Sequence, residues 1–334
     1  MKDNPCQQKI ESKKLFLIGT GFSKAVFDDV PLNDELLERM IAKKSKPLSK
    51  YTKKYSVKDI IELLLTYLDL DIIKNPHEKS LDDDRKIINR QIAEFFQQFR
   101  IKKRLNKEKE WWKTFSQDIL QENDSVVTLN YDCILEGMLD HYNVWSPKNG
   151  YGPIKYPVDS DLRKNPKGIN IYKVHGSEHF IKGSPIGSGN TFVSHEINEC
   201  TFPNSGKNKN FFVGNSLGPY IIPPSYVKIP HLYISIAMNE ALYKAKSSNT
   251  MIIMGCGMRP EDSFLQLLTG AFVYSPQKLK KKIIIVDINA SDIKNKVKSY
   301  FDEYIEPENI ISIEEGIENS MEELKMNIME GDQL

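Results

Sequence analysis

The sequence contains few cysteines and no long apolar run. Its cysteines are Cys6, Cys133, Cys200 and Cys256, which lie far apart and form no C-x-x-C pair. This spacing argues against a disulfide framework and against a zinc site built from cysteines, and it favours a reducing compartment. No window approaches the roughly 18 apolar residues of a membrane-spanning helix, and residues 1–14 lack the apolar core of a signal peptide. We therefore expect a cytoplasmic protein without a membrane segment.

An excess of charge of either sign is also missing. The chain has 46 basic and 45 acidic residues, a net charge of +1, so no field of the whole molecule attracts nucleic acid. Lysines gather between Ile41 and Lys58 without an acidic residue among them, and a second basic cluster spans Arg100 to Lys109. Such clusters are more often solvated faces than nucleic-acid contacts. Direct binding of nucleic acid is therefore not expected.

The composition is otherwise that of a globular protein. Of the 334 residues, 40% are hydrophobic, 10% aromatic and 27% charged, as in ordinary soluble domains. This length suggests about two domains, or one domain enlarged by insertions. It also allows a core large enough to need no disulfide or structural metal.

Short apolar runs recur along the chain and alternate with stretches of helical periodicity. The runs are Leu15–Ile18, 125–129, 169–174, 250–254, 282–287 and 309–313. The helical stretches begin at Ser23 and continue at 131–142, 231–245, 262–273, 290–304 and 317–329. This alternation predicts an α/β fold with a Rossmann-like, mostly parallel sheet and helices on both faces.

Two segments interrupt the alternation. Residues 45–122 are predicted to form a helical insertion, because amphipathic spacing recurs at 57–70, 81–105 and 111–120. A short helix, Asn33–Ala42, precedes it, with Asn33 as the expected N-cap. Residues 179–220, mostly rich in Gly, Ser and Asn without a clear period, predict a loop-rich insertion. Residues 1–44 and 123–334 then make up one Rossmann-type domain.

A glycine motif follows the first predicted strand. Gly19-Thr20-Gly21-Phe22-Ser23 stands between a buried strand and a helix. In that context glycines let backbone N–H groups approach a pyrophosphate, and the helix N-terminus favours negative charge. Lys24 occupies the position of the third glycine of the usual dinucleotide fingerprint. A purely structural tight turn is the alternative.

Polar residues follow two further strands. Asn130 and Asp132 come after 125–129, and His175 comes after 169–174, at the strand ends where open α/β sheets collect ligands. A neutral imidazole can act as a base near pH 7. The alternatives are an Asx turn or helix cap for the first pair and a structural histidine for the second. His179 and His195 lack companions at metal-site spacing and receive no role.

Two later strands end in similar residues. The run 250–254 leads into Gly255-Cys256-Gly257, and the run 282–287 ends in Asp287-Ile288-Asn289. An acidic or amide side chain at such a strand end can accept hydrogen bonds from ribose hydroxyls. An ordinary loop is the alternative at each position.

Four of these strand ends, which carry Gly-x-Gly-x-Ser, Asn-x-Asp, His-Gly and Gly-x-Gly in this order, resemble the sirtuin family, and especially its bacterial sirtuin-like branch. The resemblance covers roughly residues 15–44, 124–178 and 220–313. It implies that the NAD pyrophosphate binds Gly19, Thr20, Gly21 and Ser23. It also implies that Asn130 and Asp132, which match the family's Thr-x-Asn-x-Asp motif, hold the nicotinamide ribose and carboxamide, and that His175 is the catalytic histidine.

The resemblance further implies that the remaining strand ends bind NAD. Gly255, Cys256 and Gly257 are similar to a later glycine element of the family, and Asp287 and Asn289 to its ribose-binding strand end. The chain departs from sirtuin deacylases in two respects. It has no paired cysteines for a zinc ribbon, and Asp29-Val30-Pro31-Leu32 stands where they have Gly-Ile-Pro-Asp-Phe-Arg.

These departures make binding of an acyl-lysine peptide doubtful. The helical insertion and the missing zinc ribbon instead resemble the sirtuin-like modules of bacterial antiphage systems, which hydrolyse NAD to nicotinamide and ADP-ribose. The resemblance thus implies an NAD hydrolase that uses NAD as substrate, needs no metal, and acts in defence by depleting NAD. Two alternatives stay open: a module that senses NAD or ADP-ribose without turnover, and a divergent NAD-dependent deacylase. We also expect a homo-oligomer, or docking to a partner ATPase or a nucleic-acid-sensing subunit, if the helical insertion exposes apolar residues.

Overall fold

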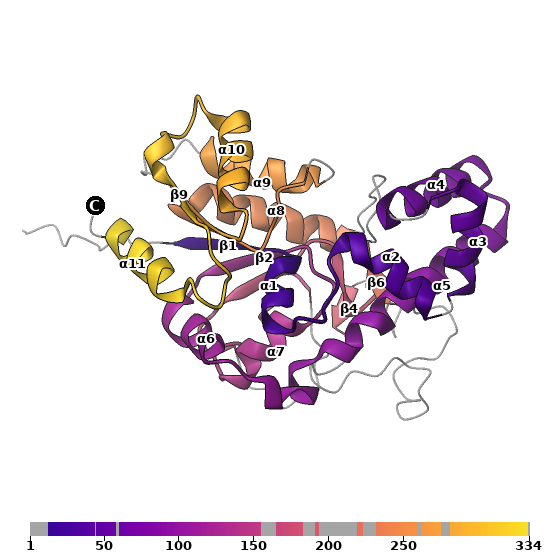
Figure 1. The fold of residues 1–334 in the computed structure, drawn as a ribbon, viewed down its shortest axis with the longest axis horizontal. Coiled ribbons are helices and arrows are strands. Elements are labelled where there is room, and N and C mark those ends of the chain that lie inside the picture. The colour runs from indigo at the N-terminus through magenta and orange to yellow at the C-terminus, as the bar shows by residue number, and fades with distance from the viewer. Residues whose placement is uncertain are drawn as a thin grey trace, which may run out of the picture.

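A parallel sheet forms the centre of the molecule (Figure 1). The computed structural model describes residues 13–43, 45–57, 60–154, 165–182, 191–193, 219–222, 232–259, 262–274 and 281–332. The sheet has six strands, and every neighbouring pair is parallel. The strands are β1 (Lys14–Ile18), β2 (Ser125–Thr128), β3 (Asn170–Lys173), β7 (Thr250–Met254), β8 (Lys282–Val286) and β9 (Ile310–Ile313).

Helices cover both faces of this sheet, as Figure 1 shows. One layer consists of α8 (Leu232–Ser247), α9 (Ser263–Val273) and α10 (Ala290–Phe301). The opposite layer consists of α1 (Thr20–Val26), α6 (Glu110–Lys113), α7 (Ile134–His141) and α11 (Met321–Asp332). Successive side chains of β1 point to opposite faces: Leu15 and Leu17 enter the core with α8 to α10, Phe16 and Ile18 the other core. The predicted fold class is confirmed.

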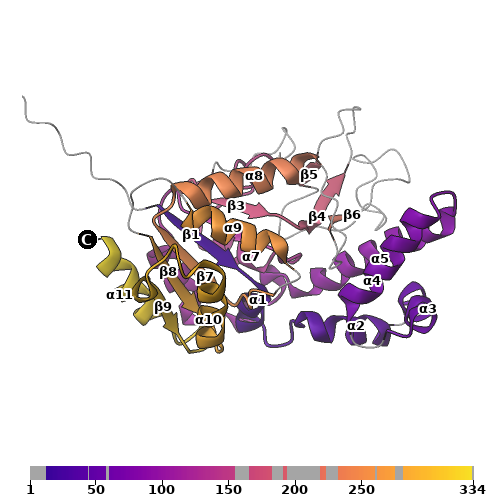
Figure 2. The same cartoon turned by 90° about the horizontal axis from the view of Figure 1, so that it is seen from above.

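The strand order creates a crevice at the middle of the sheet. The order is β3-β2-β1-β7-β8-β9. The chain therefore adds β2 and β3 on one side of β1, and then β7, β8 and β9 on the other side. Numbered among themselves, these strands run 3-2-1-4-5-6, the order of dinucleotide-binding folds. Figure 2 shows β1 beside β7 from above. Ligands of open α/β sheets bind where the order reverses, which here is the carboxyl ends of β1 and β7.

A group of helices extends to one side of the sheet in both views (Figures 1 and 2). It contains α2 (Asn33–Ala42), α3 (Lys46–Tyr55), α4 (Ile61–Lys74) and α5 (Lys79–Phe96). Helix α3 was not predicted. The hydroxyl of Ser45 caps it by accepting the N–H of Leu48 at 3.4 Å, and the rings of Tyr51 and Tyr55 stack with centroids 5.8 Å apart.

Several predicted helix boundaries were wrong. The helix predicted over 81–105 ends at Phe96 and continues as 3₁₀ turns at 97–99, 101–103 and 105–107. The helix predicted over 57–70 begins at Ile61 and runs to Lys74. The stretch 111–120 is α6 followed by a π-helix over Thr114–Ile119. Asn33 does not cap α2, because the helix already begins there and Leu32 holds the N-cap position.

A small antiparallel sheet stands in part of the predicted loop-rich insertion. Its strands are β4 (Gly176–Lys182), β5 (Thr191–Val193) and β6 (Pro219–Ile221), in the order β5-β4-β6. The prediction of loop is therefore wrong for these strands, since their partners lie far away in the sequence and leave no local pattern. Most of 183–218, including His195, lies outside the described residues. Within the described residues, no helix is long and apolar enough to cross a bilayer.

Candidate functional site

Two glycine loops, after β1 and β7, pack directly against each other. The N–H of Gly19 donates to the carbonyl of Met254 at 3.0 Å, and that of Gly21 to the carbonyl of Gly255 at 2.9 Å. A Cβ atom on Gly19 would lie 2.4 Å from the carbonyl oxygen of Gly255, and one on Gly21 2.7 Å from its Cα. Close approach of the two backbones therefore requires glycine at both positions. Because these two N–H groups are used in the contact, they do not face a ligand.

Asn130, Ser23 and Asp132 form a hydrogen-bonded cluster beside the loops. Asn130 Nδ2 donates to the carbonyl of Gly19 at 2.9 Å and to Ser23 Oγ at 3.0 Å. Ser23 Oγ in turn donates to Asp132 Oδ2 at 2.9 Å. All three side chains are buried, and Asp132 Oδ1 also accepts the N–H of Ile134 at the start of α7. Since both amide hydrogens of Asn130 are committed, its carbonyl oxygen is the group it can offer to a ligand.

His175 lies in the turn between β3 and β4, next to Tyr131. Their rings stack with centroids 6.4 Å apart, and both are largely buried. The hydroxyl of Tyr131 donates to the carbonyl of Ile222 at 2.8 Å, and the N–H of Ile222 donates to the carbonyl of His175 at 2.7 Å. Tyr131 was not predicted as a site residue, although it stands between Asn130 and Asp132. Tyr131 therefore connects the imidazole of His175 to the hydrogen-bonded cluster of Asn130, Ser23 and Asp132.

Asp287 and Asn289 follow β8, next to the loop that follows β7. The N–H of Gly255 donates to the carbonyl of Val286 at 3.1 Å, which places the end of β8 beside this loop. Asp287 Oδ1 accepts the N–H of Asn289 at 2.9 Å. Burial raises the pKa of the Asp287 carboxyl, and that N–H opposes the shift. Asp287 is half-buried and Asn289 is exposed, so both can meet a ligand at this edge.

Cys256 and Gly257 complete the loop after β7. The Cys256 side chain is buried, and burial raises the pKa of its thiol to about 12, so the thiol is neutral near pH 7. Gly257 is exposed, and a Cβ atom there would meet no atom within 4 Å. Lys296 of α10 donates to the Gly257 carbonyl at 3.1 Å. Gly257 thus borders open space, whereas Gly255 is enclosed by the neighbouring backbone.

Two ion pairs are buried next to the residues that follow β2, since Lys173 Nζ donates to the carbonyl of Asp132 and the N–H of Glu178 to that of Tyr131. Lys173 Nζ lies 2.8 Å from Glu136 Oε1, and Arg100 Nε lies 3.2 Å from Glu178 Oε1. Each of the four side chains is at most 1% exposed. Burial raises the pKa of both carboxyls, and the facing cations oppose that shift. For Arg100 the prediction of a solvated basic face is therefore wrong, because its guanidinium pairs with Glu178 in the interior.

His179 is buried in β4 and belongs to a second polar cluster. Its Nδ1 lies 2.8 Å from Cys133 Sγ and 2.9 Å from Ser177 Oγ, and its Nε2 lies 3.0 Å from the hydroxyl of Tyr151. Burial raises the pKa of the Cys133 thiol, which keeps it protonated. Within the described ranges, no group of three or more His, Cys, Asp or Glu side chains is placed to hold a metal.

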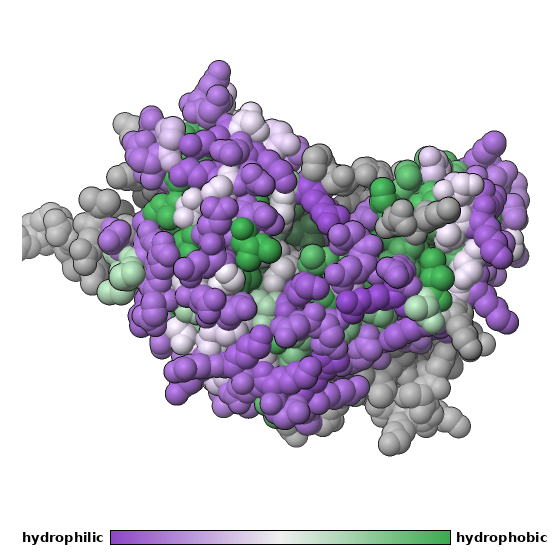
Figure 3. Space-filling model, viewed as in Figure 1, coloured by the Kyte–Doolittle hydropathy of each residue, from purple (hydrophilic) through white to green (hydrophobic). Residues whose placement is uncertain are grey.

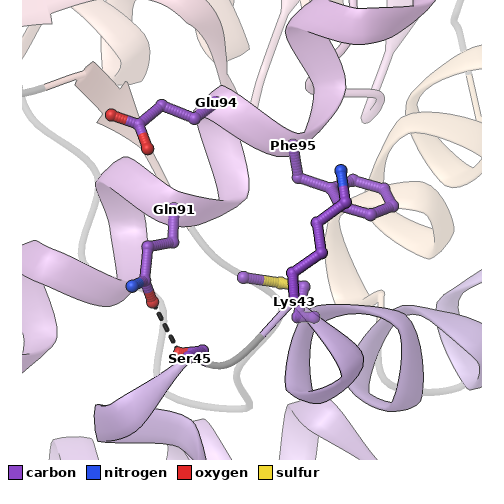
Figure 4. Close-up of a pocket in the computed structure, with 6 residues that line it drawn as sticks. Lys43, Ser45, Gln91, Glu94 and Phe95 are labelled. Carbon is purple, nitrogen blue, oxygen red and sulfur yellow. Dashed lines mark hydrogen bonds between the residues drawn. The ribbon is translucent and has the colours of Figure 1, made fainter.

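A separate pocket lies in the helical group, as Figure 4 shows. It has a volume of about 240 Å³ and is lined by Met40, Lys43, Ser45, Gln91, Glu94 and Phe95. Ser45 Oγ donates to Gln91 Oε1 at 2.6 Å, and Lys43 Nζ lies 4.5 Å from the centre of the Phe95 ring. Two of its polar side chains, Ser45 and Gln91, therefore satisfy each other. None of the site residues predicted from the sequence lines this pocket.

The fold and these contacts define a Rossmann-like α/β protein with a polar crevice at the carboxyl edge of its sheet. The loops after β1, β2 and β7 meet directly in the crevice. His175 joins them through Tyr131, and Asp287 adjoins them through Gly255. The structure thus brings residues from five strand ends to one edge.

Comparisons with known proteins find a likeness to solved structures of Sir2 proteins. No protein-family model and no curated protein matches the sequence. An ADP-ribose complex of a mutant Sir2 homologue is 14% identical, with a TM-score of 0.47, over 97% of this chain and 95% of that chain. An NAD complex of a Sir2 homologue is 14% identical, with a TM-score of 0.41, over 96% of this chain and 91% of that one. These likenesses concern the path of the backbone, so a function has to be argued from the side chains of the crevice.

Proposed function

We propose that the chain binds NAD in this crevice and hydrolyses the bond between nicotinamide and ribose. The observation that carries the proposal is the hydrogen-bonded cluster of Asn130, Ser23 and Gly19 at the reversal of strand order. A dinucleotide spans such a reversal in folds with this strand order. The motifs of the sequence, which resemble those of sirtuins, favour NAD among dinucleotides.

The residues at the crevice suit the parts of NAD. Asp287 and Asn289 offer oxygens that can accept hydrogen bonds from ribose hydroxyls, and Gly257 leaves room for a ligand beside its backbone. Asn130 presents an acceptor oxygen beside the glycine loops. Thr20, half-buried at the first residue of α1, offers a hydroxyl on the same edge of the sheet. NAD itself supplies the reactive pyridinium glycoside.

The reaction that we propose breaks the C1′–N bond of the nicotinamide riboside. Water attacks C1′ through an oxocarbenium-like state, and nicotinamide leaves with the electron pair of that bond. In this scheme the amide oxygen of Asn130 orients the water or a ribose hydroxyl, and the imidazole of His175 accepts the released proton. General base catalysis of this kind contributes about 10²- to 10⁴-fold in rate, or roughly 3–5 kcal/mol.

The two alternative functions predict different products. A deacylase releases nicotinamide only when an acyl-lysine peptide is present, and a sensor binds NAD or ADP-ribose without any product. The imidazole of His175, buried against Tyr131, favours turnover over simple sensing, because binding alone requires no base.

One assay separates these functions. The purified chain is incubated with NAD, with and without an acyl-lysine peptide, and nicotinamide and ADP-ribose are separated and measured. We expect both products without peptide, and a loss of at least about 100-fold in turnover for Asn130→Ala and for His175→Ala with the fold retained. His141→Ala is the matched control, since His141 lies at the end of α7 and is partly exposed. Full turnover by a folded His175→Ala variant, or no binding of NAD at all, refutes the proposal.

We further propose that turnover depletes NAD during antiphage defence, as the resemblance to the bacterial sirtuin-like branch implies. Infected cells that express the wild-type chain are then expected to lose NAD, and cells that express Asn130→Ala to keep it. Measurement of cellular NAD after infection tests this role. An unchanged NAD level in infected wild-type cells contradicts it.

Self-association stays a prediction of the sequence analysis. Figure 3 shows apolar residues on the helical group at the right of a mostly hydrophilic face, which carries further apolar patches near its middle and left. The exposed apolar side chains at α4 are Ile60, Tyr67, Leu70 and Ile73. Size-exclusion chromatography with light scattering measures the oligomer, and a strict monomer at micromolar concentration counts against self-association.

A further inference from the structure

The buried ion pair of Arg100 and Glu178 connects the helical group to the crevice. Arg100 lies between the 3₁₀ turns that follow α5, and Glu178 lies in β4. Arg100 Nε is 3.2 Å from Glu178 Oε1, and the side chains are 1% and 0% exposed. The pair thus joins two segments that are distant in the sequence, entirely out of contact with water.

Such a pair is a poor device for stability alone. Removing two charges from water costs several kcal/mol per ion, and the attraction within the pair often does no more than offset that cost. Apolar side chains of similar size would hold the same two segments together at least as well. Unlike apolar packing, an ion pair fixes the orientation of the two side chains relative to each other, because the guanidinium and the carboxylate meet in a defined geometry.

The backbone of Glu178, which lies three residues after His175, contacts Tyr131. The N–H of Glu178 donates to the carbonyl of Tyr131 at 2.9 Å, and Ser177 Oγ reaches the same carbonyl at 3.2 Å. The ring of Tyr131 stacks on His175, and its hydroxyl is bonded to Ile222, which in turn bonds the backbone of His175. A shift of β4 at Glu178, to which the Arg100 side chain is paired, would therefore move the backbone that holds Tyr131 and, through its ring, the surroundings of the imidazole.

The helical group also packs on Tyr131 from another direction. The rings of Phe96, at the end of α5, and Tyr131 have centroids 6.0 Å apart. Arg100 follows this phenylalanine by about one helical turn of chain and reaches β4. The end of α5 and the turn after it therefore contact the residues around His175 twice, through the Phe96 ring on Tyr131 and through the ion pair of Arg100 with Glu178.

We propose that Arg100 and Glu178 are positioning residues for His175, through which the helical group fixes the imidazole for catalysis. This inference rests on the proposed function for its catalytic part. Because both side chains are at most 1% exposed, we do not expect the pair to contact NAD, so its loss should lower kcat and leave the KM for NAD close to its wild-type value. A base displaced by about 1 Å costs up to about 100-fold in rate.

Two variants test the pair. Glu178→Gln keeps the size of the side chain and removes its charge. The double variant Arg100→Met with Glu178→Met replaces both charges by apolar chains, which keeps the packing and protects the fold against a buried single charge. We expect both to fold and to lose about 10- to 100-fold in kcat. A merely structural role predicts wild-type kcat for the double variant, and that result overturns the inference.

Asp124→Asn is the matched control. Asp124 Oδ2 lies 3.5 Å from Lys14 Nζ in another buried pair, with 2% and 4% exposure. This pair lies at the opposite edge of the sheet, where β1 and β2 begin. We expect wild-type kcat for this variant. A loss of kcat equal to that of Glu178→Gln would mean that any buried pair has this effect, and it overturns the positioning role.

A measurement without NAD separates this inference from the proposed function. The ring signals of His175 in NMR spectra of the ligand-free chain are expected to move in Glu178→Gln, while those of His141 stay in place. Unmoved His175 signals overturn the positioning role, whatever the activity of the wild type. Absence of NAD turnover by the wild-type chain, with moved His175 signals, refutes the proposed function instead.

Discussion

The contact between the two glycine loops predicts a large difference between two glycines of the same loop. Gly255 has a φ of +57°, and a Cβ atom there would lie 2.3 Å from the backbone nitrogen of Phe22 and 2.6 Å from the carbonyl carbon of Gly21. A left-handed conformation costs a residue with a side chain roughly 1–2 kcal/mol. Forcing an extra carbon against backbone that cannot rotate away adds about 1–3 kcal/mol. We therefore expect Gly255→Ala to lower the free energy of unfolding by about 2–5 kcal/mol.

The measurement is urea unfolding followed by tryptophan fluorescence, since Trp111, Trp112 and Trp145 are all buried. Gly257→Ala is the control, because a Cβ atom at that position meets nothing within 4 Å. Its free energy of unfolding should stay within about 0.5 kcal/mol of wild type. Its affinity for NAD should fall if the ligand occupies the adjacent space. An unfolding midpoint of Gly255→Ala equal to that of Gly257→Ala refutes the close packing of the two loops.

Two further predictions concern buried polar groups. Burial raises the pKa of Asp124 from 3.8 to about 6, so its contribution to stability is present below pH 3.8 and is lost as the pH rises through 6. The Asp124 carboxyl thus lowers the free energy of unfolding by up to about 3 kcal/mol between pH 4 and 7. The free energy of unfolding of Asp124→Asn, measured across this range, should lack that fall. An equal dependence on pH in both proteins contradicts the prediction. Ser23→Ala should cost about 1–3 kcal/mol in chemical unfolding, because it leaves buried groups of Asn130 and Asp132 without their partner. Ser299→Ala, at an exposed serine of α10, is the control and should be neutral.

The sheet could be predicted because its signals are local. Each strand is short, apolar and followed by polar or glycine residues, as in Leu15–Ile18 and 250–254. The carboxyl ends of parallel strands share one edge, so the convergence of Gly19, Asn130 and Gly255 followed from the fold class alone. The exact hydrogen bonds did not follow. Glycine spacing indicates an approach to a phosphate and an approach to another backbone equally well.

The rest of the molecule depends on partners that are distant in the sequence. Tyrosines contribute to the apolar side of helix α3. Its lysines pair with acidic residues on other helices, as Lys50 does with Asp84 at 2.8 Å. In the sequence these lysines indicate only a basic run. Arg100 stands in a basic cluster too, and nothing nearby in the chain points to Glu178. The strand β4 is buried along its described side chains and so lacks the alternation that marks a half-exposed strand.

The position of β1 at the centre of the sheet determines the order in which the contacts of the crevice can form during synthesis and folding. Gly19 is synthesised well before Gly255, which packs on it, because β2, β3 and the helical group lie between them in the sequence. Closing contacts between such distant segments is slow, because a long loop must be ordered first. The crevice is therefore among the last parts of the protein to form. A translation product that stops before β7 contains the loop after β1 but lacks the loop after β7 that packs against it.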